Sequence, residues 1–190
     1  FSRIQKENYY YVDKTMFIEK IEMQPPYLFL IRPRRFGKSL TLAMLEAYYD
    51  VNHAEQFDEL FGQLYIGQHP TKLHNQFLIM RFNFSNVNEV ELSFKLHCCS
   101  KLKDFVFKYE DLLGKEVWDV LDEKIQEEPG AFLSAVNSYA TRKKNIRIYL
   151  LIDEYDNFTN TILSTYGTEF YRKATHGEGF IRGFFNVIKS

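Results

Sequence analysis

The strongest constraint on the fold of this chain is the stretch of residues 27–41, which reads YLFLIRPRRFGKSLT. Its first five residues form an apolar run bounded by prolines, and such a run predicts a buried strand. A turn ending in Gly37-Lys38-Ser39 follows, and the good helix formers after it predict a helix that opens near Ser39. Strand, loop, Gly-Lys-Ser and helix is the order that a phosphate-binding P-loop requires.

Each part of this segment has a physical role in phosphate binding. A helix N-terminus presents unpaired N–H groups and the positive end of the helix dipole. Gly37 lets the backbone approach a phosphate, and Lys38 can reach the β- and γ-phosphate oxygens as a point charge. The Ser39 hydroxyl can ligate Mg²⁺, which prefers oxygen ligands. We therefore expect the backbone amides from Phe36 to Ser39 to surround the phosphates.

The loop departs from the usual motif at one position. The pattern G-x-x-x-x-G-K-[ST] requires glycine at position 32, where this chain has Arg32. Arg34 and Arg35 add further positive charge, which is compatible with a triphosphate but implies a different backbone path. The alternative interpretation is a basic turn before an ordinary helix.

A second segment, residues 146–154, has the form of a Walker B element: an apolar strand that ends in Asp153-Glu154. Asp153 would hold Mg²⁺, and Glu154 would orient and activate the attacking water as a general base. Since ligands in open α/β sheets bind at the carboxyl ends of strands, we expect both carboxylates to face the same crevice as Lys38. Alone, this pattern is more typical of a strand-terminating turn, but together with Gly-Lys-Ser it indicates nucleoside triphosphate binding.

Three stretches together resemble the predicted AAA-ATPase-like family of bacterial and archaeal proteins. They are NYYYVDKT at 8–15, RPRRFGKSL at 32–40 and LLIDEYD at 150–156, and the resemblance runs over all 190 residues. It accounts for Arg32, because the P-loop of this family resembles a Walker A motif without the first glycine. Members often carry a PD-(D/E)xK nuclease-like domain at their C-terminus.

The resemblance implies a P-loop NTPase with an additional catalytic glutamate. It gives Lys38 and Glu154 catalytic roles, with Ser39 and Asp153 as the Mg²⁺ residues. Asp156 matches the family motif but receives no role. The nucleotide-binding residues expected on this basis are Arg34, Arg35, Phe36, Gly37, Lys38, Ser39 and Leu40.

Composition supports a globular chain with ordinary charge. Hydrophobic residues make up 45% and the formal net charge is -1, so nothing global favours nucleic acid or membrane binding. The two cysteines, Cys98 and Cys99, are adjacent and lack metal-ligand spacing, which predicts free buried thiols in a reducing cytoplasm. The sequence has no signal segment and no apolar run of about 18 residues, so we expect a cytoplasmic protein without a membrane span.

The rest of the chain alternates strand and helix patterns, which predicts an α/β fold with a mainly parallel sheet. Strands are expected at 27–31, 77–83 and 147–152. Helices are expected near 16–21, 39–49, 54–60, 91–113, 116–127, 131–142, 158–166 and 180–188. We interpret residues 1–190 as a single AAA-ATPase-like P-loop NTPase domain, a three-layer sandwich that is incomplete at its C-terminus and lacks its last core strands.

Six side chains outside these motifs are weaker candidates. Tyr11 or Val12 would pack on the adenine base, although packing of a Tyr-rich edge on the core is an equal alternative. Asn83 or Ser85 would contact Mg²⁺-bound water, because they follow the strand at 77–83. Asp13 or Thr15 is expected to cap the helix that follows them.

The sequence therefore predicts Mg²⁺-dependent ATP binding and hydrolysis that drives or gates a neighbouring domain. The alternative is a nucleotide-gated interaction module with little or no hydrolysis, and a small-molecule kinase is disfavoured by the tandem Asp153-Glu154. The expected partners are ATP, further copies of the chain in a homo-oligomer, and a C-terminal nuclease-like domain outside this chain. Any contact with nucleic acid would come through that domain alone.

Overall fold

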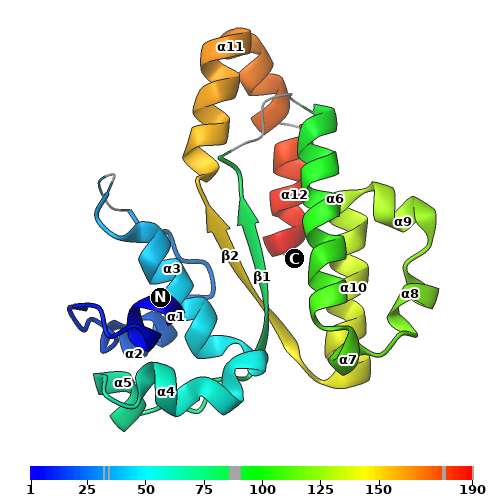
Figure 1. Cartoon of the computed structure of the whole chain (residues 1–190). Coiled ribbons are helices and arrows are strands. Elements are labelled where there is room, and N and C mark those ends of the chain that lie inside the picture. The colour runs from blue at the N-terminus through cyan, green and yellow to red at the C-terminus, as the bar shows by residue number, and fades with distance from the viewer. Residues whose placement is uncertain (32, 34, 86–90, 177–178, 190) are drawn as a thin grey trace. The chain divides into compact units, whose positions relative to one another are not determined.

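The structure is a computed structural model that describes residues 1–31, 33, 35–85, 91–176 and 179–189 (Figure 1). Arg32, Arg34 and the side chain of Asp156 lie outside the described residues. The chain divides into two compact units, Phe1–Ile79 and Met80–Ser190, here called the N-terminal and C-terminal units. Each unit is described by itself.

The N-terminal unit is built from short helices around one longer helix. The elements are α1 (Ser2–Lys6), α2 (Phe17–Glu22), α3 (Lys38–Tyr49), the 3₁₀ helix η1 (Val51–Gln56), α4 (Phe57–Phe61) and α5 (Tyr65–Gln68). α3 buries Leu42, Leu45 and Tyr48, and α1 packs against both α3 and α4. The Tyr48 ring meets Phe61 edge-on at 5.4 Å, so aromatic packing organises this core.

Asp13 and Thr15 accept hydrogen bonds from the start of α5, and these bonds, here called the staple, fix the segment before α2. Thr15 is fully buried, and its hydroxyl donates to Asp13 Oδ1 (2.7 Å) and accepts from the Ile66 amide (3.1 Å). Asp13 Oδ2 accepts from the Tyr65 amide at 2.7 Å, across 52 residues of sequence. The expectation that Asp13 or Thr15 caps the following helix is therefore wrong, because both side chains bond to the start of α5 instead. α2 begins after Met16 without a side-chain cap.

The strand expected at 27–31 is absent. These residues have no strand assignment, and Phe29 and Ile31 are 69% and 88% exposed. A strand exists only where a neighbouring strand supplies its ladder of hydrogen bonds. Among the described residues of the N-terminal unit, a strand occurs only at its last positions, from Phe77 onward. An apolar pattern of this kind favours β structure, but propensity alone does not supply a partner strand.

The C-terminal unit contains the parallel sheet and the long helices. Its elements are the end of β1 (Phe77–Asn83), α6 (Glu91–Lys108), α7 (Glu110–Leu113), α8 (Val117–Val120), α9 (Glu123–Glu127), α10 (Pro129–Lys144), β2 (Arg147–Asp153), α11 (Tyr155–Thr175) and α12 (Phe180–Lys189). β1 and β2 lie side by side and point the same way (Figure 1). α10 contacts β2, α6 and α12, and α12 also contacts α11.

An aromatic cluster joins the end of β1 to the helices of the C-terminal unit. Phe84 stacks on Phe94 of α6 at 5.6 Å and on Phe158 of α11 at 5.8 Å. Phe82 meets Phe184 of α12 edge-on at 5.4 Å. All five rings are at most 4% exposed. These contacts fix the carboxyl end of β1 within the unit, which matters because candidate site residues lie there.

The α/β class and two of the three expected strands are confirmed. β1 and β2 match the predictions at 77–83 and 147–152, and the helix expected at 39–49 is α3. The helix expected at 91–113 is interrupted at Tyr109, and α11 is longer than expected with a non-helical Gly167 (φ 78°) inside it. The sheet of the described residues has two strands, so the three-layer sandwich and the single domain stay predictions. No helix in the described ranges combines the length and apolarity of a membrane span.

Candidate functional site

The P-loop candidate begins with a left-handed glycine. Gly37 is the N-cap residue of α3, with φ 77° and ψ 21°. This conformation is open to glycine and costs other residues about 1–2 kcal/mol. A Cβ built on Gly37 would meet no heavy atom within 4 Å, so the space beside it is open. The backbone conformation therefore favours glycine at this position, and the space beside its Cα is open.

The first turn of α3 offers donors and positive charge. The Gly37 carbonyl accepts from the Thr41 amide (2.8 Å) and from the Thr41 hydroxyl (3.0 Å), which closes the first helical turn. As N-cap residue, Gly37 has no side chain to cap the first amides, and the first turn carries no acidic side chain. Ser39 is exposed and Lys38 is half-buried. This helix start can accept an anion.

The loop before Gly37 has a second unusual residue. Arg35 adopts φ 67°, which is rare for residues other than glycine and asparagine. The Phe36 amide donates to the Pro33 carbonyl at 3.3 Å, so the loop turns back on itself there. The Phe36 ring is 67% exposed. The arginine in place of the usual first glycine thus precedes a loop that still ends in the left-handed glycine.

The Walker B candidate lies at the carboxyl end of β2. Asp153 is the last residue of β2 and is 1% exposed, with Oδ1 accepting from the Glu154 amide at 3.1 Å. Glu154 links β2 to α11 in a left-handed conformation (φ 57°, ψ 29°). Such strain costs about 1–3 kcal/mol and is concentrated at functional sites, because only the surrounding structure holds it in place. Of the two residues predicted from the sequence, Asp153 is therefore held in the strand and Glu154 in an unusual backbone conformation.

The ends of β1 and β2 bring further polar groups to the same edge. The Phe84 amide donates to the Asp153 carbonyl at 3.1 Å, so the two strands end side by side. Asn83 is exposed, and its Oδ1 accepts from the Ser85 amide at 2.9 Å. The structure thus brings Asn83 and Ser85 to the strand end that carries Asp153, as the parallel pairing predicts.

Arg81 is a residue of this edge that the sequence reading missed. Its Nη2 lies 3.7 Å from Asp153 Oδ2, and its side chain is 32% exposed. The signal was present in the sequence, because Arg81 is the only charged residue in the apolar run from Phe77 to Phe84. A charge inside a buried strand requires a partner, and Asp153 on the neighbouring strand supplies one.

His97 of α6 also lies against the end of β1. Its ring centroid is 5.7 Å from that of Phe84. Burial lowers the pKa of His97, nearby Lys101 lowers it further, and a hydrogen bond with the Asn83 backbone raises it; the pKa remains below the usual range. His97 is therefore neutral at neutral pH and packs as part of the aromatic cluster. No catalytic role was expected for it, and its surroundings give none.

The residues at this edge fit a magnesium ion by their chemistry. Asp153 offers a hard oxygen donor, and the guanidinium beside Oδ2 is evidence that this carboxylate accommodates a positive charge. No group of three or more His, Cys, Asp or Glu side chains that could hold a metal occurs in the described part of the chain. A P-loop ion does not need such a group, because Mg²⁺ takes most of its ligands from phosphate and water.

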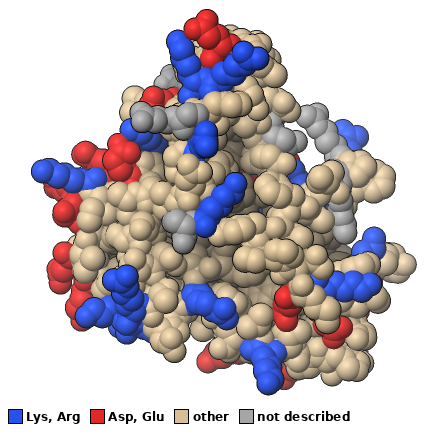
Figure 2. Space-filling view, turned by 180° about the vertical axis from the view of Figure 1, so that it is seen from behind, with Lys and Arg blue, Asp and Glu red and all other residues tan. Residues whose placement is uncertain are grey.

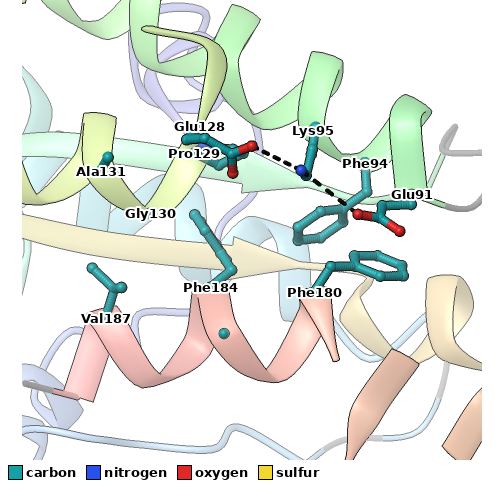
Figure 3. A pocket seen from close by; sticks show the side chains of 11 residues that line it. Glu91, Phe94, Lys95, Glu128, Pro129, Gly130, Ala131, Phe180, Phe184 and Val187 are labelled. Carbon is teal, nitrogen blue, oxygen red and sulfur yellow. Dashed lines mark hydrogen bonds and ion pairs between the residues drawn. The ribbon is translucent and has the colours of Figure 1, made fainter. Parts of the chain in front are cut away.

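A separate cavity of about 450 Å³ lies between α6, the start of α10 and α12 (Figure 3). Phe94, Phe180 and Phe184 line its apolar side. On its rim, Lys95 Nζ lies 2.8 Å from Glu128 and 3.6 Å from Glu91, so one lysine pairs with two carboxylates. None of the residues predicted for the nucleotide site lines this cavity.

The structure places the predicted residues in two groups. Arg35 to Leu40 lie in the N-terminal unit, whereas Asp153 and Glu154 lie in the C-terminal unit. A common crevice for both groups stays a prediction, and Arg34 lies outside the described residues.

Tyr11 packs on the core, where its hydroxyl reaches Met44 Sδ at 3.5 Å, while Val12 is 56% exposed. On the face in Figure 2, Lys and Arg are scattered, and Asp and Glu lie mainly along one edge, at the top and at the bottom.

Comparison with known proteins gives two matches of different extent. A stretch of 46 residues is 52% identical to an uncharacterized protein from the vnfD 5′ region of Azotobacter chroococcum mcd 1, and it covers 24% of this chain and 9% of that protein. No solved structure is significantly similar to the chain. The family model described as "Predicted AAA-ATPase" matches residues 1–190, the entire sequence. The chain, with its glycine-started helix and its Asp-Glu strand end, therefore belongs to the predicted AAA-ATPase family, whose name implies nucleotide binding.

Proposed function

We propose that the chain binds ATP with Mg²⁺ and hydrolyses it, and that this reaction drives or gates a neighbouring domain. The observation that carries the proposal is the start of α3, where left-handed Gly37 opens onto free space before Lys38 and Ser39. This arrangement suits a phosphate, because the first backbone amides of α3 and a lysine meet at one helix N-terminus. The family membership of the whole chain supports the same function.

On this proposal the residues of the N-terminal unit bind the phosphates. Backbone amides from Phe36 to Ser39 would donate to the phosphate oxygens, and Lys38 would neutralise charge on the β- and γ-phosphates. Arg34 and Arg35 would add positive charge to the loop. Leu40 would contribute the next amide of the helix.

Ser39 of the N-terminal unit and the two carboxylates of the C-terminal unit would act on the metal and on water. Ser39 and Asp153 would hold Mg²⁺, which supplies positive charge to the transferring phosphoryl group when bound. Glu154 would accept a hydrogen bond from the attacking water and take its proton. The left-handed turn at Glu154 supports this role, because strained backbone at a strand end is typical of catalytic residues. The proposal requires that both groups of residues act on one nucleotide.

Calorimetric titration of ATP in the presence of Mg²⁺ tests the phosphate site. We expect Lys38→Ala to weaken ATP binding at least tenfold, whereas Lys72→Ala, a matched exposed lysine of the N-terminal unit, binds like wild type. Equal binding by wild type and Lys38→Ala would refute the phosphate role of the loop. Absence of binding by the wild-type chain would refute nucleotide binding by residues 1–190.

Turnover of ATP tests the carboxylate. We expect Glu154→Gln to bind ATP as wild type does and to lose most of its hydrolysis, while Glu127→Gln on exposed α9 keeps it. Phosphate release measured under saturating ATP gives the comparison. Unchanged turnover in Glu154→Gln would remove Glu154 from the mechanism.

One observation favours the alternative, a nucleotide-gated interaction module with little hydrolysis. Apolar side chains on both sides of the loop are exposed: Phe29 by 69%, Ile31 by 88% and Phe36 by 67%. Such side chains are typical of surfaces that bind another protein. Tight ATP binding with turnover that is equally low in wild type and Glu154→Gln would support this alternative. The nuclease-like domain and the homo-oligomer expected from the family resemblance are the partners proposed in either case.

A further inference from the structure

The ion pair between Arg81 and Asp153 joins the two strands of the sheet at the edge that carries the proposed metal ligand. Arg81 lies on β1 and Asp153 ends β2, with Nη2 and Oδ2 3.7 Å apart. The Asp153 side chain is 1% exposed. Both residues belong to the C-terminal unit, and Figure 1 shows the two strands side by side.

A carboxylate buried to this degree requires positive charge nearby. An ionised group removed from water loses several kcal/mol of solvation, which only a counter-charge and hydrogen bonds offset. Asp153 Oδ1 accepts the Glu154 amide, and Oδ2 faces the guanidinium. Arg81 is therefore the counter-ion of Asp153.

A divalent cation bound at Asp153 would meet this fixed positive charge. The guanidinium and the cation would compete for the same carboxylate, since like charges a few ångströms apart repel. We propose that Arg81 is the counter-ion that a divalent cation must displace from Asp153, and that it thereby weakens metal binding in the nucleotide-free protein. This inference rests on the proposed function, in which Asp153 is a metal ligand.

The ion pair then has opposite effects on two measurable quantities. Without nucleotide and metal, Arg81 stabilises the fold because it neutralises buried Asp153. With Mg²⁺ and ATP, the same charge opposes the metal. Removal of the charge should therefore lower the Tm of the metal-free chain and strengthen the dependence of ATP binding on Mg²⁺. A residue with a purely structural role would lower the Tm and leave the dependence on Mg²⁺ unchanged.

The experiment measures the Kd for ATP by calorimetry twice, once with EDTA and once with saturating Mg²⁺. The quantity compared between variants is the Kd in EDTA divided by the Kd in Mg²⁺, and a larger ratio means a stronger dependence of ATP binding on Mg²⁺. The variants are Arg81→Met, which keeps the aliphatic length, and Arg81→Gln, which keeps a donor for Asp153 and serves if the first does not fold. We expect the ratio to rise about tenfold, equivalent to about 1.4 kcal/mol of coupling. Arg81→Lys keeps the charge and should behave as wild type does.

Two controls test whether the effect is specific to Arg81 and whether it requires the Asp153 carboxylate. Lys101→Met removes a lysine of an exposed ion pair with Asp104 in the same unit and should leave the ratio unchanged. Asp153→Asn should abolish the Mg²⁺ dependence, and adding Arg81→Met to it should then have no further effect on the ratio. Thermal unfolding in EDTA without nucleotide gives the second readout, in which Arg81→Met should melt below wild type.

The outcomes separate this inference from the function on which it rests. A ratio that stays at the wild-type value in Arg81→Met and in Arg81→Gln overturns the competition but leaves ATP binding intact. An equal rise in Lys101→Met also overturns it, because the effect would then be general electrostatics. A wild-type chain that binds no ATP in either buffer refutes the proposed function, and this inference with it.

Discussion

Replacement of Thr15 by valine tests the staple that fixes the segment before α2. Valine keeps the shape of threonine and removes only the hydroxyl, which makes two hydrogen bonds inside the N-terminal unit. Loss of the bond to the Asp13 carboxylate costs about 1.5–3 kcal/mol, because the acceptor is charged. The Ile66 amide would be left buried without its acceptor, which costs about 1–3 kcal/mol. The extra methyl group offsets about 1 kcal/mol, so we expect a net loss of roughly 1.5–5 kcal/mol.

The assay is chemical and thermal unfolding followed by far-ultraviolet circular dichroism. For a chain of this size, the loss corresponds to a fall in Tm of roughly 3–20 °C. Thr15→Ser is the matched control, because it keeps the hydroxyl and loses one methyl group, at about 1 kcal/mol. A Thr15→Val chain within about 1 kcal/mol of wild type, or a Thr15→Ser chain as unstable as Thr15→Val, would refute the role of the hydroxyl.

The acid dependence of the same variant gives a second check. Burial raises the pKa of Asp13, but hydrogen bonds from the amides of Tyr65 and Thr15 and from the Thr15 hydroxyl outweigh it, so the pKa is lowered. The stability from ionised Asp13 is therefore present above the unfolded pKa of about 3.9 and is lost as the pH falls through the lower folded pKa. Thr15→Val removes one donor, so its stability should fall less steeply in acid than that of wild type. Parallel acid profiles would contradict the charged partner.

Three further predictions follow from backbone strain and burial. Gly37→Ala should lower stability by about 1–2 kcal/mol and weaken ATP binding in calorimetry, because alanine strains the left-handed position (φ 77°) without a clash. An unchanged Tm would contradict this strain. Glu154→Gly should raise stability by up to about 1 kcal/mol in unfolding experiments, because glycine relieves the strain of the positive φ. It should also abolish turnover, because it removes the carboxylate; a lower Tm would contradict the relief of strain. Cys98 and Cys99 should resist iodoacetamide in the folded chain at neutral pH and react after unfolding, with labelling measured by mass spectrometry. The reason is that burial raises the pKa of both thiols, that of Cys99 to about 11. Rapid labelling of the native chain would contradict this prediction.

Sequence reasoning located the candidate site segments but not all of their environment. Gly37 and the strand end at Asp153-Glu154 were identified from local chemistry, and Gly37 and Glu154 both have left-handed backbone in the structure. Arg81 was passed over, although it is a charge in an apolar strand. Its meaning became visible only when β2 placed Asp153 3.7 Å away, more than 70 residues further along the chain.

The sequence by itself determined the elements whose signals are local. Strands β1 and β2 and helix α3 occur where apolar runs, turn residues and helix formers predicted them, because these preferences act within a few residues. The segment 27–31 shows the limit of such signals. Its apolar pattern favours a strand, yet its residues are exposed and form none, because a strand depends on a ladder partner that sequence distance does not reveal.

Only the tertiary structure decided which polar side chains meet. Asp13 and Thr15 looked like helix caps, but they bond to the start of α5 about fifty residues away. Arg81 and Asp153 pair because two parallel strands end side by side. The physical reason is the same in both cases: a buried polar group must find a partner, and the fold determines which distant residue is near enough to serve.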